Sequence, residues 1–239
     1  MRRLVNRQVA GVLLMGLLLV LAGCNGGGGG TPTATPTATP QNSTNSSSSS
    51  ASANMSMDGK IALQPYQFSE GESYTYNVTF LGSSTVNTWK VVSVDNGTMT
   101  VNATQSSASG GEQVSTIRGN QTTLMMAAAQ DNIAQFFAQA RNAMALQGIV
   151  ANASSGTTMQ LSKDNLANPK AVSWTTANLT VKDTTTVNGI SCTRATLEPD
   201  SGPTSTACLA ADYPFPLTLT ATQGGRTALA MKLTNATRP

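Results

Sequence analysis

The sequence predicts a mainly β fold of the α+β type. We expect an antiparallel meander sheet, folded as a half-barrel or a sandwich and covered by a helix at about 123–147. Three observations predict it. Apolar and polar residues alternate over many short segments, as in half-buried strands. Asn-Gly and Gly-Gly pairs separate these segments at hairpin spacing. One stretch, rich in Ala, Gln, Leu and Met, instead has a helical period.

The first residues predict export. Three arginines precede an apolar run from Val9 to Leu21, and small residues follow, which is typical of a secretory signal at 1–23. The run is shorter than the ~20 apolar residues of a spanning helix. Residues 58–239 are enough for a single β-rich extracytoplasmic domain.

The end of the signal carries a recognisable motif. Leu21-Ala22-Gly23-Cys24 resembles the lipobox of prokaryotic lipoproteins. The resemblance implies cleavage before Cys24 and a diacylglycerol on its sulfur, whose two acyl chains anchor the protein to the extracytoplasmic face of the membrane. The alternative is a plain signal peptide with an unrelated cysteine.

Residues 24–57 predict a lipidated cysteine followed by a disordered tether. Glycines, Thr-Pro repeats and a Ser/Asn tract follow Cys24 in turn. As a flexible coil, the tether reaches about 30 Å. A glycine run and Thr-Pro tether after a lipobox are similar to those of archaeal surface lipoproteins.

The amino-terminal half of the domain predicts strands. Tyr74, Tyr76, Val78 and Phe80 share one face of the first strand. Two further strands flank an Asn96-Gly97 turn, and the second has Met99, Val101 and Ala103 facing inward. Gly110-Gly111 predicts another turn, followed by a short strand over 114–118.

The helical stretch at 123–147 allows two interpretations. Its apolar stripe comprises Ile133, Phe136, Phe137, Ala140 and Met144, and Gly148 is placed to end the helix. The stripe either covers the sheet as ordinary core or forms a wall for a lipid or another apolar ligand. In the second case, Ile133, Phe136, Phe137 and Met144 are the ligand wall.

The β pattern returns after Asn168-Pro169. Asn188-Gly189 and Gly224-Gly225 predict hairpin turns. The predicted strands are Ala171–Thr175, Leu179–Thr186, Ile190–Leu197, Ser205–Asp212, Phe215–Thr222 and Thr227–Thr234.

Cys192 and Cys208 remain as an even pair in a secreted chain, which predicts a disulfide between two neighbouring strands. The alternative is a redox-active pair, but the Cys-x-x-Cys spacing of thiol oxidoreductases is missing.

The carboxy-terminal part carries a second resemblance. The pattern "VNGISCTRATLE…STACLAADYPFPLTLTAT" is similar in outline to half-barrel lipoprotein carriers and lipid-binding lipoproteins. That resemblance implies an acyl chain held between sheet and helices.

Composition excludes several function classes. The chain has no histidine, which removes the usual general base and His-dependent catalytic or metal sites. Three of its 14 basic residues are signal arginines, so the mature chain carries 11 basic and 11 acidic residues. The basic residues are scattered, so we expect no nucleic-acid binding. We also expect no catalytic residues, metal or cofactor.

The enzymatic alternative depends on two pairs of carboxylates that are close in the sequence. Glu70/Glu72 and Glu198/Asp200 could serve a hydrolase or a calcium site. Each pair lies beside Gly or Pro, where solvated turns normally carry acids.

Asn-x-Ser/Thr sequons occur at about twice the frequency expected by chance. They indicate either N-glycosylation or Asn and Thr clustering in turns and on polar strand faces. Within the domain, they lie at Asn77, Asn96, Asn102, Asn120, Asn152, Asn178 and Asn235.

Together these features predict a non-enzymatic, membrane-anchored surface lipoprotein that binds an apolar small ligand or an envelope protein. One alternative is a glycosylated structural or adhesive envelope protein with a packed core and no ligand. Another is a carboxylate-dependent hydrolase.

Overall fold

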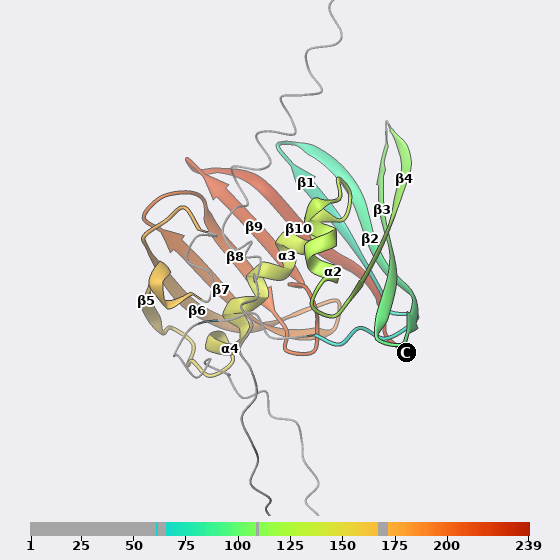
Figure 1. The fold of residues 1–239 in the computed structure, drawn as a ribbon. Helices are drawn as coiled ribbons and strands as arrows, with labels where there is room; N and C mark the ends of the chain where they lie inside the picture. The colour runs from blue at the N-terminus through green and yellow to red at the C-terminus, as the bar shows by residue number, and fades with distance from the viewer. Residues whose placement is uncertain (1–60, 62–65, 109, 167–171) are drawn as a thin grey trace, which may run out of the picture.

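A computed structural model describes residues 61, 66–108, 110–166 and 172–239. The predicted signal, Cys24 and the predicted tether at 24–57 lie outside the described residues. The described chain forms one open sheet of ten antiparallel strands, with short helices across one face (Figure 1). The mainly β, α+β prediction is therefore confirmed. A sandwich is not formed, because all ten strands belong to one sheet.

The sheet consists of two meanders with the helices between them in sequence. The first comprises β1 (Ser73–Phe80), β2 (Ser83–Asp95), β3 (Thr98–Ser107) and β4 (Gly111–Asn120). The helical region comprises α2 (Leu124–Gln130), α3 (Gln135–Ala143), the 3-10 turn η1 (Met144–Leu146) and α4 (Gln147–Val150). The second comprises β5 (Thr158–Ser162), β6 (Thr176–Val187), β7 (Ile190–Pro199), β8 (Thr204–Leu209), β9 (Thr218–Gln223) and β10 (Arg226–Thr237), with the 3-10 turn η2 (Lys163–Asn165) after β5.

The strand order explains where the helices lie. It runs β4-β3-β2-β1-β10-β9-β8-β7-β6-β5, so the first and last strands pair at the centre. The chain leaves the sheet at the β4 edge and re-enters it at the β5 edge. The helical connection therefore crosses the width of the sheet (Figure 1).

Three hairpins use the predicted two-residue turns. Both residues of Asn96-Gly97, Asn188-Gly189 and Gly224-Gly225 have positive φ, as a type I′ turn requires. A fourth, at Leu81-Gly82, also has both φ values positive. It was not predicted, because leucine rarely adopts this conformation.

Some strand predictions were wrong. β5 was missed, because its sequence TMQLS is short and weakly alternating. The predicted strand Ala171–Thr175 does not form: its described residues are irregular and β6 begins at Thr176. β9 begins at Thr218 rather than Phe215, because Pro214 and Pro216 have no N–H to donate.

The single predicted helix is interrupted. α2 ends at Gln130, and α3 begins at Gln135 after a turn at 131–134. Asp131 causes the break, because its Oδ1 accepts from the N–H groups of Ile133 (2.8 Å) and Ala134 (2.7 Å) and so starts a new helix. Gly148 does not end the helical region, which continues to Val150.

The two faces of the sheet differ sharply. The apolar face carries the buried strand residues, such as Val78, Leu179 and Leu219. The opposite, polar face carries a row of threonines directly paired across five strands. Cross-strand threonine pairs stabilise a sheet without adding charge, which accounts for much of the neutral composition. The row is Thr158, Thr180, Thr196, Thr206 and Thr220.

Candidate functional site

The residues of the predicted ligand wall lie against the sheet. Phe137 is fully buried and Met144 is buried, both within the main core. Ile133 and Phe136 are partly buried and pack against the same core. Ile133 lies in the turn before α3 rather than in a helix. The structure therefore brings all four together as helix–sheet packing residues.

Aromatic rings fill the space beneath α3. The Phe137 ring lies 5.2 Å from Phe215 and 5.4 Å from Trp89, between ring centroids. Phe215 in turn lies 5.6 Å from Trp89 and 5.9 Å from Tyr74. These are ordinary packed or edge-to-face distances. The rings pack against one another between α3 and the sheet.

A buried carboxylate lies at the beginning of β1. Glu72 is only 4% exposed, so the expectation that its turn is solvated was wrong. Its Oε2 accepts from Tyr74 Oη at 2.9 Å and from Tyr66 Oη at 3.3 Å. Its Oε1 accepts from Ser69 N at 3.1 Å. The carboxylate thus ties residues 66–72 to the sheet.

The tyrosines of this cluster have raised pKa values. Burial, followed by the hydrogen bond to Tyr66, raises the pKa of Tyr74 far above its usual value. Burial also raises the pKa of Tyr66. Both phenols therefore stay protonated at neutral pH and donate to Glu72. The cluster forms a hydrogen-bond network that joins the segment before β1 to Tyr74 in β1.

A buried cation joins α3 to the same region. Arg141 is 5% exposed, and its Nη1 donates to the Pro214 carbonyl at 2.7 Å. Its guanidinium lies 5.7 Å from the centroid of the Tyr66 ring, within cation–π range. Burial lowers the pKa of Arg141 to about 10, so it remains charged at neutral pH. Arg141 therefore links the helix, the loop before β9 and the segment before β1.

The sequence analysis did not predict that Glu72 and Arg141 lie in one cluster, in which both contact Tyr66. The two tyrosines that follow Glu72 at alternate positions were assigned to an apolar face. The phenol group of Tyr74 was the available signal, because buried tyrosines usually need a hydrogen-bond partner and Tyr74 donates to Glu72. Arg141 interrupts an apolar helix, which was a second signal.

The two predicted carboxylate pairs do not share a cleft. Glu70 lies in the turn before β1, Glu198 lies in β7, and both are exposed. Three strands separate β1 from β7. Asp200 accepts from Thr175 N at 3.1 Å and Thr176 N at 3.0 Å. Among the described residues, no group of three or more His, Cys, Asp or Glu side chains is placed to hold a metal ion.

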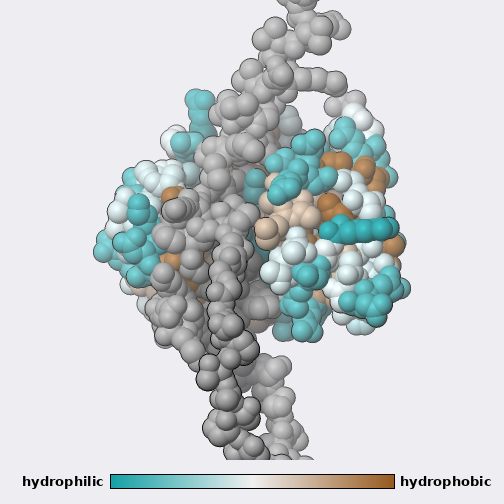
Figure 2. Space-filling view, viewed as in Figure 1, coloured by the Kyte–Doolittle hydropathy of each residue, from teal (hydrophilic) through white to brown (hydrophobic). Residues whose placement is uncertain are grey.

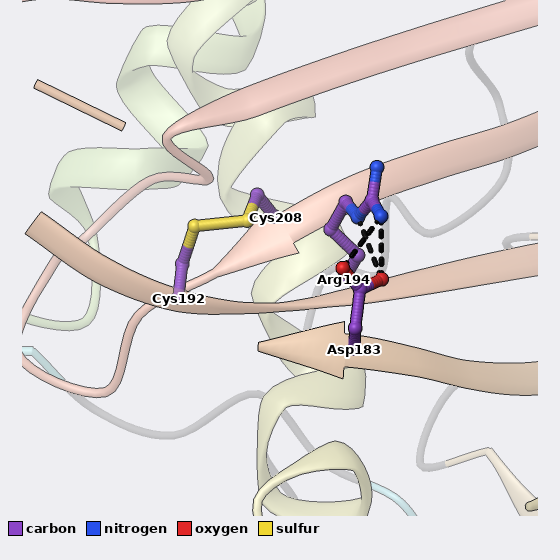
Figure 3. The surroundings of a disulfide bond; sticks show 4 residues. All are labelled: Asp183, Cys192, Arg194 and Cys208. Carbon is purple, nitrogen blue, oxygen red and sulfur yellow. Dashed lines mark hydrogen bonds and ion pairs between the residues drawn. A yellow bond between two sulfur atoms is a disulfide. The ribbon is translucent and has the colours of Figure 1, made fainter. Parts of the chain in front are cut away.

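Cys192 and Cys208 form a disulfide between the neighbouring strands β7 and β8 (Figure 3). Close by, Arg194 Nη2 donates to Asp183 Oδ2 at 2.7 Å, which ties β7 to β6.

An open cavity of about 210 Å³ lies beside Cys192, between α4 and the ends of β7 and β8. Ligand sites for drug-sized molecules are typically about 300–1,000 Å³, so this cavity is small for a lipid chain.

Four sequons lie within strands, with the asparagine and the threonine on the polar face and the middle residue on the apolar face. They begin at Asn77, Asn102, Asn178 and Asn235. Strand alternation by itself therefore generates an Asn-apolar-Thr pattern. All but the half-buried Asn102 are exposed. Glycan occupancy stays a prediction.

The other three sequons lie at turns or ends. Asn96 is exposed in the β2–β3 turn. Asn120 Oδ1 accepts from Thr122 N at 3.0 Å and Thr123 N at 2.9 Å. Asn152 Nδ2, the atom that would carry a glycan, donates to the Gly148 carbonyl at 2.9 Å.

The visible surface around α2, β3 and β4 is mainly teal and white, with smaller brown areas (Figure 2). None of the described helices combines the length and the apolar character needed to cross a membrane.

No protein-family model and no curated protein match this sequence. Solved structures of MucB are similar in part. "Crystal structure of MucB" is 13% identical with a TM-score of 0.43, covering 70% of this chain and 53% of that chain. "Crystal structure of MucB in complex with MucA(peri)" is 14% identical with a TM-score of 0.41, covering 70% and 49%.

"The complex structure of Pseudomonas aeruginosa MucA/MucB" is likewise 14% identical with a TM-score of 0.41, covering 70% of this chain and 50% of that chain. The chain thus spans about half the length of these matched structures. At such scores, the likeness says nothing about activity or partners.

Proposed function

We propose that this chain is a non-enzymatic surface lipoprotein, anchored outside the cell membrane through Cys24, that acts by binding an envelope protein with its surface. The lipobox and tether support the anchor. The disulfide supports an oxidising, extracytoplasmic location. The missing histidine and the separated carboxylates argue against hydrolysis.

One observation favours a surface-binding role over a role as a lipid carrier. The rings of Phe137, Trp89 and Phe215 pack directly on one another between α3 and the sheet. A carrier of the half-barrel type needs that space for an acyl chain. With the space filled by side chains, recognition falls to the outside of the molecule.

The alternative of a glycosylated structural or adhesive envelope protein also has a specific observation in its favour. Exposed sequon asparagines such as Asn77 and Asn178 lie on the polar face, where a glycan meets no core residue. Intact-mass measurement of protein from its natural source distinguishes this role, because occupied sequons add sugar masses.

The anchor is tested by detergent phase partitioning of the full chain against a Cys24→Ala variant. We expect the unchanged chain to enter the detergent phase and the variant to remain in the aqueous phase. Equal partitioning of the two would contradict a lipid on Cys24.

The partner is tested by photo-crosslinking on intact cells. A photoreactive residue is placed at the exposed position Lys90 or Lys232 of the polar face, with the buried position Met231 as matched control. We expect a discrete protein adduct from an exposed position and none from Met231. Adducts only to lipid would contradict a protein-binding role.

A further inference from the structure

β4 forms one edge of the ten-stranded sheet. Its inward side is fixed: Ile117 is buried, and Ser115 Oγ donates to Asp131 at the turn between α2 and α3. Gly119 lies so close to α2 that an added Cβ would be 2.8 Å from the Leu124 backbone. An edge held rigidly from one side offers an extended strand for pairing on the other.

The polar-face residues of β4 are exposed and have a particular order. Glu112, Val114, Thr116 and Arg118 alternate along the strand, and all four are exposed. Val114 is 55% exposed, and Val86, Val92 and Val94 of β2 are exposed as well. The strand thus carries an acid near its beginning, a base near its end and an apolar residue between them.

This order is self-complementary. If two copies of β4 pair antiparallel about Ser115, Glu112 of each lies opposite Arg118 of the other, and Val114 lies opposite Thr116. Directly opposed side chains on one face are close enough for ion pairing and apolar contact. A shift of one residue would place each charge opposite an inward-facing residue. The charges therefore favour one register.

The other edge does not offer the same match. β5 has only five residues, Thr158–Ser162, and none of them is charged. Pairing of β4 with β5 would also be head-to-tail and would build an open chain of molecules, whereas β4 with β4 closes on a two-fold axis.

We propose that two copies of this protein associate through β4, antiparallel and centred on Ser115, so that their sheets join edge to edge. The contact uses the outer edge of β4, which pairs with no second strand among the described residues, for backbone hydrogen bonds. Two symmetric Glu112–Arg118 pairs set the register. It is independent of the proposed envelope partner.

The test measures the molar mass of the full mature chain, made water-soluble by Cys24→Ser, over a range of concentrations by sedimentation. We expect a monomer–dimer equilibrium. Glu112→Arg or Arg118→Glu alone places like charges opposite each other twice, and should raise the dissociation constant on the order of tenfold or more. The double reversal, Glu112→Arg with Arg118→Glu, should restore dimerisation.

Lys232→Glu is the matched control, because Lys232 is exposed on the polar face at the sheet centre and should leave the equilibrium unchanged. Circular dichroism confirms that each variant is folded. A monomer at all concentrations would overturn the proposal. A dimer whose dissociation constant is unchanged by either single reversal would also overturn it. So would a double reversal that fails to restore dimerisation.

Discussion

Glu72 stands between Gly71 and Ser73 in the sequence, yet its carboxylate is buried at the start of β1. Three donors surround it, from Ser69, Tyr66 and Tyr74. Because buried polar groups are costly when unpaired, the acid and its donors must be kept together. Glu70, two residues earlier, has the same chemistry but is exposed.

We predict that Glu72→Gln lowers the free energy of unfolding by about 1–3 kcal/mol, because its amide group replaces an acceptor of phenol hydrogen bonds. Glu70→Gln is the control and should change it by no more than about 0.5 kcal/mol. Urea unfolding followed by tryptophan fluorescence measures both. Equal effects would mean that the Glu72 network is not formed.

Asp131 provides a second residue-scale prediction, with a pH signature. Desolvation raises its pKa, but hydrogen bonds from Ala134, Ser115 and Ile133 outweigh this and lower it below the ordinary 3.8. A lowered folded-state pKa stabilises the fold above the unfolded value, and this stabilisation is lost as the pH falls through the folded value.

Asp131→Ala should therefore cost about 1 kcal/mol at pH 7. The difference from the unchanged protein should shrink as the pH falls below about 3.8. Unfolding curves from pH 7 to pH 2.5 measure it. A difference that stays constant across this range would exclude the charged cap as its source.

At the scale of single elements, two adjacent residues of α3 test whether the helix packs into the core. Phe136 and Phe137 are adjacent, but only Phe137 is fully buried against Trp89 and Phe215. Phe137→Ala should lower the free energy of unfolding by about 3–5 kcal/mol, and Phe136→Ala by clearly less. The reverse order, measured by the same urea unfolding, would mean that Phe137 does not lie in the core.

The β7–β8 pair provides the second element-scale prediction. The Cys192–Cys208 disulfide closes a loop with a sequence separation of 16, for which the chain-entropy model gives about 3 kcal/mol. Replacing both cysteines with serine should lower the free energy of unfolding by about that amount, and a reducing agent should then have no further effect. A reductant-sensitive double variant would contradict the pairing.

The elements that the sequence predicted correctly have strong local signals. Positive-φ turns at Asn96-Gly97 and Asn188-Gly189, and alternation in β1 and β3, depend on neighbouring residues only. β5 and the break at Asp131 depend on tertiary contacts, with β6 in one case and Ser115 in the other. The Glu72–Arg141 region joins segments about 70 residues apart, which no local pattern specifies.

For the whole molecule, the pairing of β1 with β10 determines the architecture. It places the first and last strands together near the sheet centre, and the helical connection between β4 and β5 therefore runs from one sheet edge to the other. One sheet thereby gains an apolar face covered by α2–α4 and a polar, threonine-rich face open to the surroundings. The central claim is that the space between helices and sheet is occupied by side chains and carries no lipid.

Native mass spectrometry tests this claim most directly. The mature Cys24→Ser chain is purified after exposure to a membrane lipid extract and measured intact. We predict the polypeptide mass with one disulfide, singly or as a dimer, with or without sugar increments. A stoichiometric adduct with the mass of a lipid, lost on organic extraction, would contradict the account.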